Sequence, residues 1–254
     1  MADLALNRRL RAAGIHLSIS ALVAAIASWV VFMVWYPSPL ATIAGGASLF
    51  LILVGVDVVL GPALTAVVAS PGKPRGELVR DLAVIVVIQA AAFGYGIYTM
   101  SLARPVAIAF EVDRLRVVTA ADIEPTLLAE AAPEFRSLPW NGPRLLAAVK
   151  PTERDAALRS IDLGLAGIDL SMVPANWRDW ATQRDAVWAK ARPVAVLVKE
   201  HPQAAAELAA IASATGQNVD TLRFLPLVTR RASWVTILAP DATLVGHLPY
   251  DGFF

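Results

Sequence analysis

The stretch from Leu49 to Ala69 constrains this chain more than any other. It reads LFLILVGVDVVLGPALTAVVA, and Asp57 is its one charged residue. A helix of this length is about 30 Å long, close to the thickness of a bilayer's hydrocarbon core. A helix in a soluble core is not normally apolar on every face over such a length. The stretch therefore predicts a membrane span with a carboxyl group near mid-depth.

Two further segments have the same character. Residues 14–36 contain no Lys, Arg, Asp or Glu, and neither do residues 82–103. With the central span taken as residues 47–69, the sequence predicts a membrane domain over residues 1–103. A cleavable signal peptide is the alternative for the first segment, but its apolar run is longer than a signal core and no convincing cleavage site follows it.

The positions of the basic residues predict the orientation of these spans. The six Lys and Arg of residues 1–103 lie before the first span or in the link from Ser70 to Asp81, and the loop from Pro37 to Gly46 has no charge. Basic loops stay in the cytoplasm, so the N-terminus and the link are predicted to be cytoplasmic and everything after Ala103 to lie outside. The six residues are Arg8, Arg9, Arg11, Lys73, Arg75 and Arg80.

Residues 104–254 have the composition of a soluble domain. They hold 16 of the 22 basic residues and 17 of the 21 acidic ones, although the whole chain has a mean hydropathy of +0.58. A balance of this kind offers no basic patch, which sets nucleic acid aside as a partner. The chain has no cysteine, so disulfides, thiol catalysis and thiolate metal sites are excluded.

Asp57 has three interpretations. An ionised carboxylate that faced lipid would cost at least roughly 2.5 kcal/mol, so this group should face protein or water, or be protonated. Pro62 lacks the N–H that would bond the carbonyl of Val58, which leaves an acceptor beside Asp57. The carboxyl is then a structural polar clamp, a contact for another protein's helix, or part of a proton or ion relay. A proton or ion relay is disfavoured because it would normally need more ionisable groups inside the membrane than Asp57 and His16, and His16 lies near the edge of its span.

Small residues share a stripe of the central span with Asp57, and such stripes let helices approach closely in lipid. The three spans could pack on one another through the stripe, or it could receive the helix of a partner protein. Gln89 and Ser20, on the neighbouring spans, are candidate hydrogen-bond partners for the carboxyl. The predicted partner-contact residues are Asp57, Gly61, Pro62, Thr65 and Gln89.

The soluble part alternates apolar runs with turn residues. Strands are predicted at Val106–Val118 with a bend at Asp113-Arg114, Leu145–Val149, Val194–Val198, Leu222–Leu227, Ser233–Leu238 and Thr243–Leu248. Helices are predicted from Asp122 to Ala131, from Thr152 to a stop near Gly164 or Gly167, at Trp177–Ala191 and at Pro202–Ala214. Strands and helices mixed without regular βαβ alternation predict an α+β domain with a largely antiparallel sheet.

This soluble part shows no catalytic signature. His201 and His247 lack the spacing of a helical zinc pair, and no nucleophile elbow or phosphate-binding glycine loop is present. The sequence therefore predicts no catalytic residue, metal site or cofactor. Four of the five tryptophans of this region are predicted to lie in the core, with protein-contact anchors as the alternative. They are Trp140, Trp177, Trp180 and Trp188.

Several segments resemble a known family. They are RLRAAGIHLSISA (Arg9–Ala21), WYPSPL (Trp35–Leu40), LVGVDVVLGPALT (Leu53–Thr65), PGKPRGELVRDLAVI (Pro71–Ile85), ARPVAIAFEVDRLRVV (Ala103–Val118) and PDATLVGHLPYDGF (Pro240–Phe253). Together they resemble the type IV pilin accessory protein family, TfpX/TfpZ-like.

The resemblance implies a bacterial inner-membrane protein that is not an enzyme. It implies help for a cognate major type IV pilin, in its stabilisation, its assembly into pili or the dynamics of the pilus, with a periplasmic domain after Ala103. Other pilus assembly proteins are further candidate partners beside the lipid bilayer. Two alternatives remain: a membrane-bound enzyme acting outside the cytoplasm on pilin or envelope material, and a sensor subunit.

Overall fold

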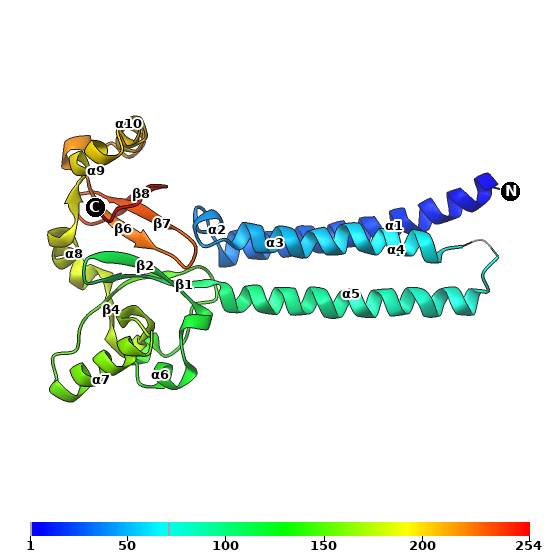
Figure 1. The fold of residues 1–254 in the computed structure, drawn as a ribbon, viewed down its shortest axis with the longest axis horizontal. Coiled ribbons are helices and arrows are strands. Elements are labelled where there is room, and N and C mark those ends of the chain that lie inside the picture. Colours follow the sequence, from blue (N-terminus) through cyan, green and yellow to red (C-terminus); the bar gives the residue numbers. More distant parts are fainter. Residues whose placement is uncertain (1, 71) are drawn as a thin grey trace. The chain divides into compact units, whose positions relative to one another are not determined.

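The computed structural model describes residues 2–70 and 72–254 (Figure 1). Met1 lies outside the described residues, as does Pro71 in the link between the second and third predicted spans. The side chains of residues 2–5 and of Arg8, one of the basic residues used to predict orientation, also lie outside them. Contacts divide the chain into an N-terminal unit, Met1–Ala103, and a C-terminal unit, Arg104–Phe254.

The N-terminal unit is helical throughout its long segments. Its elements are α1 (Ala2–Trp29), the π-helical η1 (Val30–Trp35), α2 (Leu40–Ile43), α3 (Gly46–Gly55), the π-helical η2 (Val56–Leu60), α4 (Gly61–Val68) and α5 (Arg75–Ala103). Within the described residues, three helical segments are long and apolar enough to cross a membrane: Arg9–Trp35, Gly46–Val68 and Arg75–Ala103. The three predicted membrane helices are confirmed.

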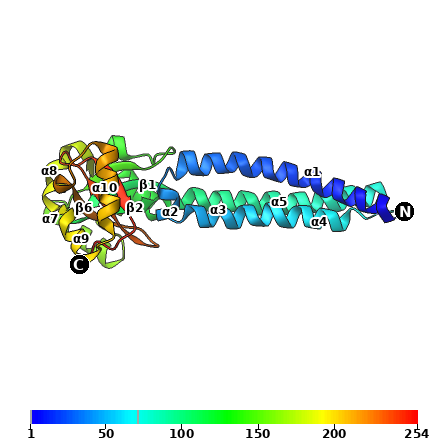
Figure 2. The same cartoon turned by 90° about the horizontal axis from the view of Figure 1, so that it is seen from above.

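These helices run side by side (Figures 1 and 2). Helix α1 packs along α4, and α5 packs along α3 and α4. At one end the ring of Tyr36 is buried, with its hydroxyl donating to the Met100 carbonyl at 3.3 Å. A Cβ at Gly46 would lie 2.6 Å from that ring, so glycine is required there. Away from these contacts the surface is apolar, as at Leu51 and Tyr95, which suits lipid as the solvent.

The C-terminal unit is built on an eight-stranded sheet. Its strands are β1 (Pro105–Glu111), β2 (Arg114–Thr119), β3 (Arg144–Ala148), β4 (Trp177–Asp179), β5 (Arg192–Pro193), β6 (Arg223–Val228), β7 (Ser233–Leu238) and β8 (Leu244–Leu248). The order is β4-β3-β1-β2-β6-β7-β8, and β5 pairs with β6. In the described chain, the β1–β3 and β2–β6 pairs are parallel and the other five are antiparallel. The predicted largely antiparallel α+β domain is confirmed.

Helices and short turns pack against the sheet and form two separate hydrophobic cores with it. The helices are α6 (Pro125–Ala129), α7 (Arg154–Leu165), α8 (Arg184–Lys190), α9 (Val194–Glu200) and α10 (Ala204–Thr215). One core joins β1, β2 and β3 to Ile123, Phe135 and Trp177. The other joins β6, β7 and β8 to α9 and α10. Figure 1 shows α9 and α10 beside β8, with α6 and α7 near β4.

Two segments of this unit adopt a different secondary structure from the predicted one. Val194–Val198 was predicted as a strand but lies in α9, because Val194 and Leu197, three residues apart, are both buried against the second core. Short apolar runs do not distinguish strand from helix by periodicity alone. In Trp177–Ala191 only Arg184–Lys190 is α-helical, since Trp177 starts β4 opposite Ala148.

The predicted start of a helix at Asp122 is also corrected. Its carboxylate accepts the Thr119 backbone N–H and hydroxyl, each at 2.8 Å, and closes the short turn Ala120–Asp122 rather than starting α6. Of the tryptophans, Trp177 and Trp180 are buried as predicted, and Trp188 is half-buried. Trp140 is 59% exposed, so its core prediction is wrong, and it lies under the Arg104 guanidinium.

Candidate functional site

The candidate site lies where the second span changes helical register around Asp57. The π-helical turn η2 holds Asp57 and runs directly into Gly61 and Pro62. In a π turn each N–H bonds the carbonyl five residues earlier, so the partner of the Asp57 carbonyl would be the N–H that Pro62 lacks. The sequence predicted a free acceptor at Val58, and the π register leaves the Asp57 carbonyl without this donor as well.

Gln89 of α5 supplies the missing donor. Its Nε2 lies 3.3 Å from the Asp57 carbonyl and 3.3 Å from Asp57 Oδ1, so one amide serves both oxygens. Gly61 makes this approach feasible, because a Cβ there would overlap Nε2 and lie 2.8 Å from Gln89 Cδ. The predicted pairing of Asp57 with Gln89 is therefore present, and Gly61 is buried under the same amide.

A second polar contact joins α4 to α1. Thr65 is 2% exposed, and its Oγ1 lies 2.6 Å from His16 Nδ1. The stripe formed by Asp57, Gly61 and Thr65 thus faces the neighbouring spans, and Pro62 is buried with it. His16, interpreted from the sequence as peripheral, is a member of this polar group. Its position four residues before the buried Ser20 was the available signal.

A groove opens between α1 and α5 and has these polar residues at its base. Its volume is about 560 Å³. We call it the α1–α5 groove, lined by Ala12, Ile15, His16, Ile19, Ser20, Val23, Asp57, Thr65, Leu82, Val86, Gln89, Ala90, Phe93 and Gly94. The Oε1 of Gln89 is buried and has no hydrogen-bond partner among the described residues. Three of the five predicted contact residues, Asp57, Thr65 and Gln89, therefore line one groove, and Gly61 lies against the Gln89 amide.

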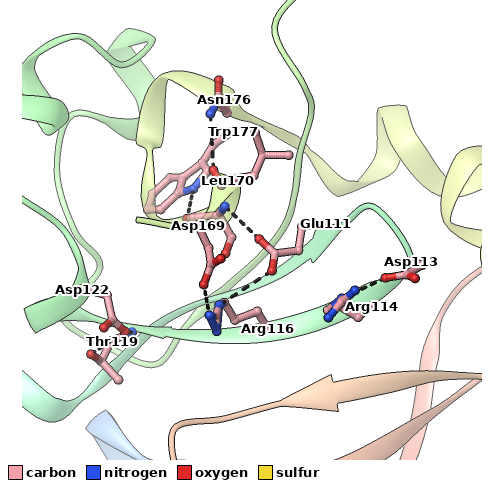
Figure 3. A network of polar contacts seen from close by, with 11 residues as sticks. Glu111, Asp113, Arg114, Arg116, Thr119, Asp122, Asp169, Leu170, Asn176 and Trp177 are labelled. Atoms are coloured by element: carbon pink, nitrogen blue, oxygen red, sulfur yellow. Dashed lines mark hydrogen bonds and ion pairs between the residues drawn. The ribbon is translucent and has the colours of Figure 1, made fainter. Parts of the chain in front are cut away.

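The C-terminal unit has a different polar network, shown in Figure 3. Glu111 of β1 is 8% exposed and accepts the Ser171 backbone N–H at 3.0 Å. Arg116 of β2 lies between two carboxylates. Its Nε is 3.7 Å from Glu111 Oε1, and its guanidinium forms an ion pair with Asp169. The indole of Trp177 donates to the Ser171 carbonyl at 2.8 Å. The Arg116–Glu111 contact joins β1 to β2, and the other interactions tie the turn at Leu170–Met172 and Asp169 beside it to the sheet, so this network holds structure in place.

The hollow beside α7 brings acids together but does not resemble a catalytic pair. It has a volume of about 290 Å³ and is lined in part by Glu130, Glu153 and Asp155. Both oxygens of Glu130 accept from the Arg159 guanidinium at 2.9 Å. This hydrogen bonding lowers the pKa of Glu130, so it remains a carboxylate paired to α7. Within the described residues, no three His, Asp or Glu side chains could together hold a metal ion.

The two histidines of the C-terminal unit have local partners. Burial lowers the pKa of His247, whose Nδ1 lies 2.9 Å from the Thr236 hydroxyl on the adjacent strand. His201 Nε2 lies 3.2 Å from the Asp251 carbonyl, and its ring stacks on Tyr250. Both arrangements tie the end of the chain to the domain.

Comparison with known proteins identifies the family. The chain is 34% identical over 242 residues to the fimbrial assembly protein, serogroup I, of Dichelobacter nodosus, and the match covers 94% of each chain. The chain belongs to the fimbrial assembly protein family. The serogroup E1 protein of that organism is 32% identical over the same coverage, and the protein of serogroups C1 and C2 is 44% identical over 110 residues, which are 43% of this chain and 84% of that one.

The model of the fimbrial assembly protein FimB family matches residues 5–45 of the chain. No solved structure matches it. The resemblance to the type IV pilin accessory family, drawn from the sequence segments, is confirmed by these matches.

Proposed function

We propose that this protein is a non-enzymatic assembly factor that holds its cognate type IV pilin in the bacterial inner membrane before the pilin enters the fibre. The observation that carries the proposal is the α1–α5 groove, which opens toward lipid and has Asp57 and Gln89 at its base. A polar group at this depth is costly and is retained for contacts or transport. Relatives named for fimbrial assembly along 94% of their length support a role in pilus assembly.

In this proposal residues 1–103 form the membrane domain and residues 104–254 a periplasmic domain. The six basic residues of the N-terminus and of the Ser70–Asp81 link support a cytoplasmic location for both segments. Pilin would then meet the protein in the membrane and outside it. Helix α7 supports the second contact, because it exposes three apolar side chains on one face: Leu158, Ile161 and Leu165.

Holding a partner fits the geometry better than the two alternatives. An extracytoplasmic enzyme would need convergent acids whose pKa values suit proton transfer. In the hollow beside α7, Glu130 instead has a lowered pKa and a fixed guanidinium partner. A sensor would need an output surface, and the link proposed to be cytoplasmic, Ser70–Asp81, is short.

The test is co-purification of the cognate pilin with the tagged full-length protein in mild detergent. We expect pilin to be retained, and a strain without the protein to show fewer surface pili. A variant with Leu158, Ile161 and Leu165 changed to Ser should bind less pilin, and Leu102→Ser, also apolar and exposed but on α5, is its control. Absence of pilin from the purified wild-type protein, together with unchanged piliation, would contradict the proposal.

A further inference from the structure

The base of the α1–α5 groove has more hydrogen-bond acceptors than donors. Gln89 gives its amide N–H groups to the carbonyl and carboxylate of Asp57. Its own Oε1 is buried and accepts nothing from the described residues. No water is available in hydrocarbon to satisfy such an atom, so the groove as it stands lacks a donor.

The walls of the α1–α5 groove are long enough, and open enough, to accommodate another helix. Its α1 side runs from Ala12 to Val23 and its α5 side from Leu82 to Gly94, each about 18 Å or three helical turns. A Cβ added at Gly94 would meet nothing within 4 Å, so the wall is open there. Gly96, on another face of α5, is instead filled by Leu53. The hollow on the Gly96 face is smaller, about 290 Å³, so the Gly94 side offers more room for a further helix.

We propose that the α1–α5 groove receives one transmembrane helix that carries a hydrogen-bond donor (a hydroxyl, amide or ammonium group) at the depth of Asp57, and that Gln89 Oε1 accepts from it. This inference rests on the proposed function, in which that helix belongs to the cognate pilin. A lipid acyl chain could fill a similar volume, but it has no donor and would leave Oε1 unsatisfied. Complementarity with the polar base therefore selects a helix over lipid.

The experiment places a benzophenone amino acid at Val86, which lines the groove, in the full-length protein co-produced with its pilin. The matched control is Val87, the next residue of α5, which is exposed but does not line the groove. We expect a pilin adduct from Val86 at several times the yield from Val87, mapping to the transmembrane helix of pilin.

Two further variants separate the groove from the donor. Ile19→Trp fills the groove from α1, whereas Leu22→Trp adds the same bulk outside it. The first should abolish the Val86 adduct and the second should not. Gln89→Met removes the acceptor at similar volume and should reduce the adduct about three- to tenfold, the range expected for one interhelical hydrogen bond.

The outcomes distinguish this inference from the proposed function. Co-purification of pilin with only lipid adducts at Val86 would overturn the groove assignment and leave the proposed function intact. An adduct that Ile19→Trp blocks but Gln89→Met leaves unchanged would overturn the donor assignment. Absence of pilin from every purified sample would overturn both.

Discussion

Removal of the Glu111 carboxylate should destabilise the C-terminal unit far more than removal of a similar carboxylate nearby. Glu111 is 8% exposed, accepts the Ser171 N–H and faces Arg116. A charge-assisted hydrogen bond contributes about 1.5–3 kcal/mol, and loss of one member of a buried ion pair costs about 3–5 kcal/mol. Because Arg116 keeps Asp169 as a partner, we expect Glu111→Ala to lower the free energy of unfolding by about 3 kcal/mol.

The control is Asp113→Ala, two residues along the same hairpin. Asp113 pairs with Arg114 at 2.8 Å, but both side chains are largely exposed, so its loss should cost less than about 1 kcal/mol. For a unit of roughly 150 residues each kcal/mol shifts Tm by about 3 °C, which gives a fall of about 9 °C for Glu111→Ala and about 3 °C or less for the control.

The assay is thermal unfolding of the full-length protein in detergent, monitored by near-ultraviolet circular dichroism. The buried Trp177 should contribute to this signal, because its hydrogen bond to Ser171 holds the indole in place. Equal shifts for the two variants would refute the reasoning, because they would mean that the buried carboxylate contributes no more than the exposed one.

Three other predictions concern single groups. Asp57→Asn should keep the hydrogen bond to Gln89 and retain more piliation than Asp57→Leu; equal loss at normal protein levels would indicate an ionised group that handles protons. His247 has a pKa lowered by burial, so the unfolded chain binds its proton more readily and stability should fall with acidification below about pH 6.5; His247→Gln should reduce that fall in a series of Tm measurements. Pairing of Glu130 with Arg159 lowers the pKa of Glu130, so its contribution is present above about pH 4.5 and lost as the pH falls through the lowered pKa. Glu130→Gln should therefore accelerate amide exchange in α7 at neutral pH, and an unchanged rate would count against this attachment of α7.

The polar groups inside the membrane could be named from the sequence only in part. Asp57 and Gln89 were identified because a charge or an amide in a long apolar run is conspicuous. Such a residue stands out from its neighbours in the sequence, without knowledge of the tertiary structure. The π-helical turn was not foreseen. It depends on how Pro62 and Gly61 let Gln89 approach, and that in turn depends on the packing of α5 against the second span.

In the C-terminal unit, patterns of apolar residues predicted most strands, because the period of two is a property of neighbouring residues. The run Val194–Val198 was mispredicted because its helical state comes from burial against β6 and α10. Glu111 gave no signal within its strand, since its partner Ser171 is sixty residues away in the chain.

Three long apolar segments and the positions of the basic residues around them were sufficient to predict a membrane protein, because solvation by lipid depends on composition summed along a helix. The α1–α5 groove, the unsatisfied Oε1 of Gln89 and the hydrogen bond from Ser171 to Glu111 could not be predicted in the same way. Each of them exists only where side chains from distant segments meet, and short-range periodicity carries no information about which segments those are.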